Sequence, residues 1–184
     1  MLRRALGNLR TSPLRGLFCL ALSAALGMPL AAGCSTKSPE KVCALYTPPS
    51  TFDPVQPVVS FSNDVLPIFG RACAFDSCHG GSPPEGNLFL GKDATRAYAN
   101  LVSVPTKIFP ALMRIAPGDA AQSFLLRKLD DDACTIAGCT GACAESMPQA
   151  LDLLPEADRL VIRAWVMQGA TSDVADAAAG ASSQ

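Results

Sequence analysis

The chain has 184 residues, which is enough for one domain with terminal segments, and its 15 basic and 16 acidic residues give a net charge of −1. No stretch gathers lysine and arginine as a nucleic-acid-binding face requires, so we expect no nucleic-acid partner. The chain has one histidine, which excludes any site that needs two imidazoles from a single copy.

Residues 1–33 have the three parts of a secretory signal. Basic residues come first, an apolar run from Leu17 to Leu30 follows, and small residues then lead to Cys34. The apolar run is shorter than the roughly 20 residues that a membrane-spanning helix needs. We therefore predict a cleaved signal peptide over 1–33. Its removal lowers the net charge from −1 to −5, because it carries no acidic residue and four basic ones, Arg3, Arg4, Arg10 and Arg15.

The five residues 30–34, Leu-Ala-Ala-Gly-Cys, resemble the lipobox of bacterial lipoproteins. The resemblance implies that Cys34 carries a lipid and becomes the new N-terminus, and Ser35 is typical of an outer-membrane address. Leu30 lies one place further from the cysteine than the usual apolar residue does. The alternative is an ordinary signal peptidase, which leaves Cys34 as a thiol or in a disulfide. We expect a lipid-anchored protein of the cell envelope, on the periplasmic side or at the outer membrane.

The exported part of the chain divides into three segments. Residues 34–57 are rich in proline, serine and threonine, which predicts an extended tether. Residues 58–171 contain the helical patterns and form the predicted domain. Residues 172–184 are small and polar, so we predict a disordered tail.

The first two predicted helices lie early in the domain. One begins near Phe61, with Ser62 as its N-cap and Asp64 in its first turn, and runs to about Cys73. The other is a short helix over 93–101 with Asp93 as its N-cap.

Two further helices are predicted towards the C-terminus. The third covers 123–129, with Asp119 as its cap after a turn. The fourth runs from Pro155 to Gly169 and has the clearest signals, with proline at the start and glycine at the end. Its predicted apolar stripe consists of Leu160, Val161, Ala164 and Trp165. These patterns indicate a mainly α fold with long loops.

The only histidine follows a cysteine that has a second cysteine five residues upstream. The segment is Cys73-Ala-Phe-Asp-Ser-Cys78-His79. A c-type haem site needs this combination, because two thiols bind the porphyrin and the adjacent imidazole then reaches the iron. The common spacer has two residues, whereas this one has four, a length that some c-type cytochromes use. The alternative is a Cys73–Cys78 disulfide with His79 at the surface.

A second axial ligand to such an iron would be a methionine, because no second histidine exists. The exported part of the chain offers Met113, Met147 and Met167. Met167 follows Trp165 on the last predicted helix, where core packing is the ordinary role, and Met113 lies among apolar residues before a turn. Met147 precedes Pro148 in a loop and is the predicted ligand, with simple loop packing as its alternative.

Several segments together resemble the small cytochrome c-like domains of planctomycete and myxobacterial type. The resemblance covers about 61–171 and implies that Cys73, Cys78 and His79 bind one covalent haem c, with Met147 as the distal ligand. Leu154 departs from the pattern, since a capping serine is usual there. Besides the Cys-Cys-His site, the resemblance rests on Phe61–Phe69, Gly86–Leu90, Ala97–Val102, Pro117–Asp119, Ser123–Leu125, Met147-Pro148, Ile162–Val166 and Gly169-Ala170.

Four other cysteines, Cys43, Cys134, Cys139 and Cys143, can pair fully in three ways. We expect two structural disulfides, one of which joins Cys43 to the loop between Cys134 and Cys143 and steadies the segment that presents Met147. A zinc site of cysteines alone is the less favoured alternative outside the cytoplasm.

These patterns favour an electron carrier over an enzyme. The expected function is one-electron transfer to redox partner proteins of the cell envelope, by a protein with membrane contact through its lipid and no catalytic residues. The first alternative is a haem-free, disulfide-stapled lipoprotein module for binding or envelope organisation. The second is a haem iron without a protein sixth ligand, which binds a small gas or peroxide.

Overall fold

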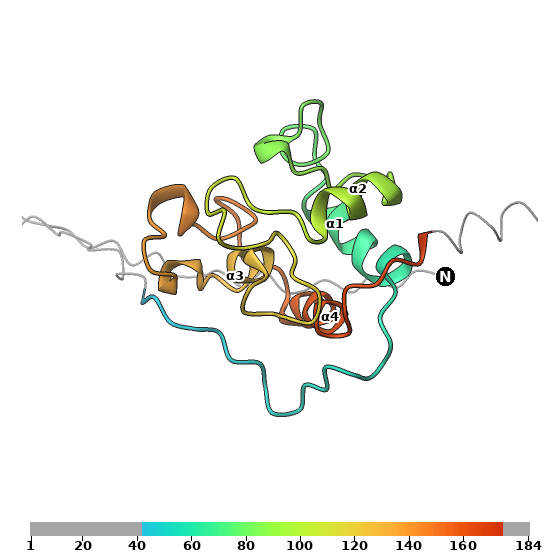
Figure 1. Cartoon of the computed structure of the whole chain (residues 1–184), viewed down its shortest axis with the longest axis horizontal. Helices are drawn as coiled ribbons and strands as arrows, with labels where there is room; N and C mark the ends of the chain where they lie inside the picture. Colours follow the sequence, from blue (N-terminus) through green and yellow to red (C-terminus); the bar gives the residue numbers. More distant parts are fainter. Residues whose placement is uncertain (1–41, 175–184) are drawn as a thin grey trace, which may run out of the picture. The chain divides into compact units, whose positions relative to one another are not determined.

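The computed structural model describes residues 42–174 (Figure 1). The regular structure of this part is helical, and strand pairing is limited to isolated bridges, which confirms the mainly α class. The signal segment, Cys34 and residues 175–184 lie outside the described residues. The α-helices of the described part are α1 (Leu66–Ala72), α2 (Ala94–Leu101), α3 (Phe124–Leu129) and α4 (Glu156–Met167). Shorter helical turns are η1 (Phe61–Val65, a π-helix) and the 3-10 turns η2 (Glu85–Asn87), η3 (Ala133–Thr135) and η4 (Gly141–Cys143).

The first helix begins with η1 and continues directly into α1. Its N-cap is Ser60, whose side chain accepts a hydrogen bond of 3.0 Å from the Asn63 amide. The predicted cap, Ser62, is wrong, because the helix begins at Phe61 and Ser62 therefore lies inside its first turn. The Ser62 amide and hydroxyl donate to the Asp173 carboxylate at 3.0 and 2.9 Å. Asp173 belongs to the segment predicted as a disordered tail, and these bonds attach its first residues to η1.

The predicted N-cap of α2 is confirmed, whereas that of α3 is wrong. Asp93 caps α2 as expected and accepts a hydrogen bond of 3.0 Å from the Arg96 amide. Asp119 does not cap α3, whose N-cap residue is Ser123. Asp119 instead accepts from the amides of Ala121 and Gln122 at 2.9 and 3.0 Å and so closes the preceding turn.

The helix α4 lies within two residues of its predicted bounds at each end. Pro155 is its N-cap residue, and Gly169 follows its C-cap with φ of 98°, a left-handed conformation that glycine adopts without strain. Of the predicted apolar stripe, Ala164 and Trp165 are buried, whereas Leu160 and Val161 are only partly buried. The buried side chains of α4 are Ile162, Arg163, Ala164, Trp165 and Val166.

Three aromatic rings form the centre of the main core. Phe61 of η1 lies 5.1 Å from Trp165 and 5.4 Å from Tyr98, measured between ring centroids. The two polar groups among these rings are satisfied, because the Trp165 indole donates to the carbonyl oxygen of Thr171 and the Tyr98 hydroxyl to that of Ala170. The cluster fixes η1, α2 and α4 against one another.

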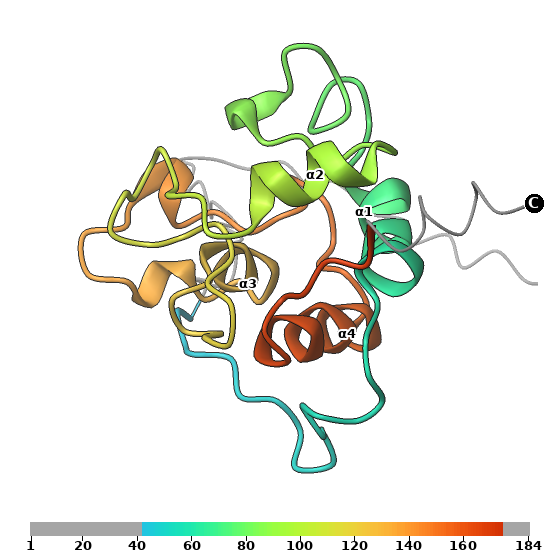
Figure 2. The same ribbon diagram turned by 45° about the vertical axis from the view of Figure 1, so that its right-hand side comes forward.

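Residues 43–59, which we call the N-terminal strap, are fastened to the domain at both ends. Figures 1 and 2 show this blue-green segment passing α3 and α4 before it enters η1. At its start Cys43 forms a disulfide with Cys134. At its end the Gln168 side chain accepts from the Val59 amide at 2.8 Å and donates to the Pro57 carbonyl at 2.9 Å. Much of the predicted tether therefore belongs to the folded domain.

A buried ion-pair cluster joins α3 to α4 beneath the strap. Asp130, the C-cap residue of α3, forms salt bridges with Arg159 and Arg163. The Tyr46 ring of the strap covers both guanidinium groups, 4.7 and 5.2 Å from its centroid. Burial raises the pKa of the Asp130 carboxyl, and the two arginines oppose that shift.

Within residues 42–174, every helix is too short or too polar to cross a membrane.

Candidate functional site

The four-residue spacer between Cys73 and Cys78 is folded into a compact turn after α1. The Phe75 carbonyl accepts from the amides of Cys78 and Gly80 at 2.9 and 3.0 Å, and the Cys73 carbonyl accepts from the His79 amide at 3.1 Å. The turn brings the backbone of His79 back to that of Cys73. Both cysteines and the histidine consequently line the same cavity.

Two glycines after the histidine make this turn possible. A Cβ atom on Gly80 would lie 2.1 Å from the Ala74 carbonyl oxygen, and one on Gly81 would lie 2.2 Å from that of Asp76. Real Cβ atoms essentially never approach this closely, and both obstacles are backbone atoms that cannot swing away. The spacer therefore packs against glycine backbone that no other residue could supply.

The thiols of Cys73 and Cys78 are both free of disulfide bonds. Burial, with a smaller contribution from the neighbouring Cys78, raises the pKa of the Cys73 thiol to about 11. Cys73 is thus a neutral thiol at neutral pH. Cys78 is partly exposed, and its sulfur lies 3.7 Å from the Ser77 hydroxyl.

The tautomer of His79 follows from its contacts. Its Nδ1 atom lies 3.1 Å from the Glu85 carbonyl oxygen and 3.0 Å from that of Leu88. Carbonyl oxygens only accept hydrogen bonds, so Nδ1 carries a proton, and Nε2 is the ring nitrogen left to face a ligand. Metal-binding histidines are typically oriented in this way by a second hydrogen bond.

The turn that orients His79 is itself held in place. Gly86 and Asn87 both have positive φ, 60° and 51°, so the chain between Glu85 and Leu88 turns sharply. The Arg114 guanidinium donates to the Asn87 carbonyl at 3.2 Å and to the Asn100 carbonyl, at the end of α2, at 2.6 Å. Burial lowers the pKa of Arg114. Arg114 thereby links the turn to the body of the domain.

A cavity of about 370 Å³ contains Cys73, Cys78, His79 and Met147 in its lining. The loop between α1 and α2, green in Figures 1 and 2, forms one wall, and α3 and the loop before α4 contribute others. Most of the exposed lining is apolar, with contributions from Leu88, Leu90, Ile108, Phe124, Leu125 and Leu129.

Large apolar side chains are exposed where they line this cavity. Phe75, Ile108 and Leu151 are 51, 58 and 67 % exposed. Because they come from three separate loops, they form an apolar lining at the cavity rather than a single exposed turn. Such a lining favours a large apolar ligand.

Met147 is the only methionine among the residues that line the cavity. It is partly buried, packs against the main core, and its amide donates to the Lys128 carbonyl at 2.9 Å. Met167 is 42 % exposed on α4, and Met113 pairs with Pro105 and Ser123 in isolated bridges. The structure thus brings together all four residues selected from the sequence.

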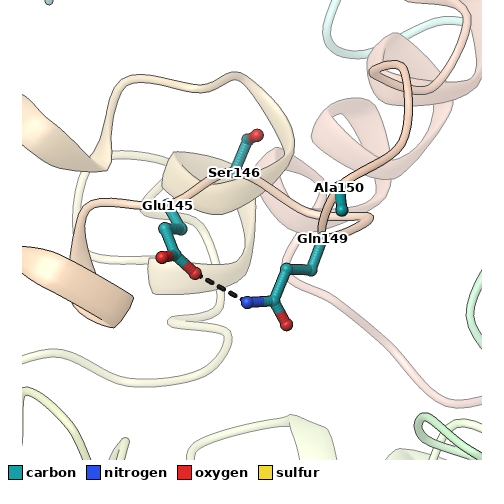
Figure 3. Close-up of a pocket in the computed structure, with 4 residues that line it drawn as sticks. All are labelled: Glu145, Ser146, Gln149 and Ala150. Carbon is teal, nitrogen blue, oxygen red and sulfur yellow. Dashed lines mark hydrogen bonds between the residues drawn. The ribbon is translucent and has the colours of Figure 1, made fainter.

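The loop that carries Met147 also has a small outer hollow. Glu145 and Gln149 are joined there by a hydrogen bond of 2.8 Å, and Ser146 and Ala150 complete the lining (Figure 3). The side chains of this hollow are mostly exposed, and the Ser146 hydroxyl points away from the Glu145 carboxylate (Figure 3). We assign it no chemical role.

The four remaining cysteines form the disulfides Cys43–Cys134 and Cys139–Cys143. The first is the predicted bridge from the start of the strap to the loop after α3, and the second closes a short loop just before Met147. No group of three His, Cys, Asp or Glu side chains within residues 42–174 is placed to hold a metal ion. Cys73, Cys78 and His79 therefore do not converge as a zinc site would require.

Sequence reasoning missed three residues of the site. Gly80 carried a detectable signal, since a glycine pair follows the histidine directly. Arg114 and Lys128 carried none, because their roles depend on backbone carbonyls that are distant along the chain, such as those of Asn100 and Ala142.

No protein-family model, curated protein or solved structure matches this chain.

Proposed function

We propose that this chain is an exported, lipid-anchored, monohaem c-type cytochrome-like protein that transfers single electrons. The observation that carries the proposal is the composition of one cavity lining. Two free thiols, the only imidazole of the chain and one thioether line the same apolar space. Each of these groups has a separate role in c-type haem binding.

The properties of the cavity fit haem. Its volume lies in the range of about 300–1,000 Å³ that is common for cofactor sites, and its lining is mostly apolar. The exposed side chains of Phe75, Ile108 and Leu151 would be covered by a flat apolar macrocycle. Nε2 of His79 would supply the nitrogen ligand that ferrous and ferric iron both accept.

Each residue has a definite role in this proposal. The thiols of Cys73 and Cys78 would hold the haem, each by adding sulfur and hydrogen across a vinyl group, and this attachment would consume no oxidant. His79 is the proximal ligand, held through Nδ1 by the carbonyls of Glu85 and Leu88. Met147 is the distal ligand, and a thioether there favours the reduced iron. When bound, haem supplies one-electron chemistry, and redox proteins of the cell envelope are the proposed partners.

The haem-free alternative is a module stapled by three disulfides, one of them between Cys73 and Cys78. These two thiols are free although four other cysteines are paired. We therefore favour the haem-binding function and propose no catalytic residues.

The experiment is expression of the full chain together with a cytochrome c maturation system. We expect a Soret band and a haem that stays with the protein under denaturing conditions. The double variant with Cys73→Ala and Cys78→Ala should lose the covalent haem. A wild-type protein that carries no haem after maturation would contradict the proposal.

The distal ligand is tested with a matched pair of methionine variants. Met147→Leu should lower the reduction potential and remove the spectral signature of methionine ligation. Met167→Leu changes a side chain that does not line the cavity and should leave both unchanged. An unaltered spectrum in Met147→Leu would exclude Met147 as the ligand.

A further inference from the structure

Lys128 is a buried lysine that lines the cavity beside the Met147 segment. Its exposed fraction is 4 %, and its neighbours on α3 include the buried Leu125 and Leu129. Burial of an ammonium group in apolar surroundings is costly unless hydrogen bonds replace its water. Leucine or methionine at this position would not have this desolvation cost.

The ammonium group of Lys128 binds backbone oxygens of the loop before Met147. Nζ donates to the Ala142 carbonyl at 2.7 Å and to the Cys143 carbonyl at 3.1 Å. Both carbonyls belong to η4, the turn closed by the Cys139–Cys143 disulfide. Charge-assisted hydrogen bonds of this kind are stronger than neutral ones.

The backbone of Lys128 binds the same loop at a second point. Its carbonyl oxygen accepts a hydrogen bond of 2.9 Å from the Met147 amide. One residue of α3 thus holds the loop on both sides of residues 144–146. The Cys139–Cys143 disulfide closes the turn that contains the first attachment point. The second attachment point is Met147, the candidate ligand.

We propose that Lys128 is a positioning residue that holds the Met147 thioether at the cavity. The proposal rests on the proposed function of Met147 as the distal ligand. Without the ammonium group, the loop loses the two hydrogen bonds from Nζ and keeps the bond from the Met147 amide to the Lys128 carbonyl. Met147 then spends more time away from its ligating position, and an added ligand competes with it more easily.

The experiment compares Lys128→Met with Lys128→Arg, and uses Lys92→Met as a control at an exposed lysine outside the cavity lining. The probe is free imidazole, titrated into the oxidised haem protein. Loss of the hydrogen bonds from Nζ should raise the apparent imidazole affinity about tenfold in Lys128→Met. Lys128→Arg keeps hydrogen-bond donors, so its imidazole affinity should be close to that of the wild type. Lys92→Met should have the same imidazole affinity as the wild type.

A second background separates positioning from general stabilisation. In Met147→Leu, the further change Lys128→Met should leave imidazole affinity unaltered, because no thioether remains to be displaced. An equal effect of Lys128→Met in both backgrounds would overturn the proposal. Unchanged affinity in the Lys128→Met single variant would overturn it as well.

Hydrogen exchange in the haem-free full chain gives a readout that does not depend on the cofactor. The amide of Met147 should exchange about tenfold faster in Lys128→Met than in wild type. If the wild-type chain takes up no haem, the proposed function fails, while this measurement still tests the attachment of the loop. An unchanged exchange rate at the Met147 amide would show that Lys128 does not position Met147, whether or not haem binds. The measurement can also be made if Lys128→Met attaches little haem.

Discussion

Gly80 and Gly81 determine whether the long spacer between the cysteines can fold. A two-residue spacer forms a single tight turn. The four-residue spacer has two more residues, and their backbone must pack against another part of the chain. Here that backbone lies against the glycines, at distances that leave no room for a methyl group. The glycine pair is therefore part of the cysteine-histidine site although it offers no ligand.

Replacement of Gly80 by alanine should damage this site specifically. The new Cβ atom meets the Ala74 carbonyl oxygen, so the turn must move, and we expect a loss of about 1–3 kcal/mol in the free energy of unfolding, as for other overpacked positions. The yield of covalent haem should fall as well. Urea denaturation and the haem-to-protein ratio measure the two effects.

Gly70 supplies the matched control, because it lies inside α1 and a Cβ atom there meets nothing within 4 Å. Gly70→Ala should stabilise the protein by about 0.5–1 kcal/mol through helix propensity. If Gly80→Ala behaved like Gly70→Ala, the steric account of the spacer would be wrong.

Among the helices, α3 and α4 are joined by charge as well as by apolar packing. Asp130 ends α3, and Arg159 and Arg163 are one turn apart on α4, so both guanidinium groups reach the same carboxylate. The side chain of Asp130 is 1 % exposed in these pairs. Removal of one partner would leave charge buried without its full compensation.

Arg163→Met should consequently lower the free energy of unfolding by about 3–5 kcal/mol, the usual cost of breaking a buried ion pair. The control is Arg71→Met, which breaks the Arg71–Asp158 pair where the arginine side chain is 54 % exposed. That change should cost at most about 1 kcal/mol. Chemical denaturation of both variants gives the comparison, and similar losses would show that burial does not decide the strength of these pairs.

The elements that were predicted correctly have local signals. Asp93 caps α2 from the adjacent position, and Pro155 and Gly169 bracket α4. Ser62 failed as a cap because the helix begins at Phe61, so Ser60 is its N-cap and Ser62 lies inside the first turn. The hydroxyls of both serines donate to the distant Asp173 carboxylate. Sequence patterns alone do not reveal such tertiary contacts.

The candidate site shows the same division between local and distant information. Cys73, Cys78 and His79 are adjacent in a recognisable motif, and Met147 was selected by elimination among three methionines. The burial of Lys128 was not predictable, since the carbonyls that stabilise it lie 14 and 15 residues further along the chain. The strap was predicted as part of an extended tether. Its proline-rich composition predicts an extended backbone but does not indicate whether that backbone is attached to the domain.

For the molecule as a whole, the two disulfides should differ in their contribution to stability. Cys43–Cys134 spans 91 residues, whereas Cys139–Cys143 spans 4. In the chain-entropy description, the long loop stabilises the fold by about 4–5 kcal/mol and the short one by about 2 kcal/mol. Most of this stabilisation arises because each bridge restricts the unfolded chain.

The test replaces both cysteines of each bridge by serine and measures the free energy of unfolding. We expect the variant without Cys43–Cys134 to lose about twice as much as the one without Cys139–Cys143. Equal losses would show that strain or local contacts outweigh the entropy of the closed loops.

The Cys43–Cys134 bridge at the start of the strap would limit the distance between the domain and the proposed lipid on Cys34. Only eight residues separate Cys34 from Cys43, and Cys43 is fixed to the domain through Cys134. A lipid on Cys34 would hold the bridge within about 30 Å of the lipid surface even with the chain fully extended. A domain joined to a membrane lipid by so short a linker would not cross a wide aqueous space. Under the proposed function, the electron partners of such an anchored domain would have to come to the same membrane surface.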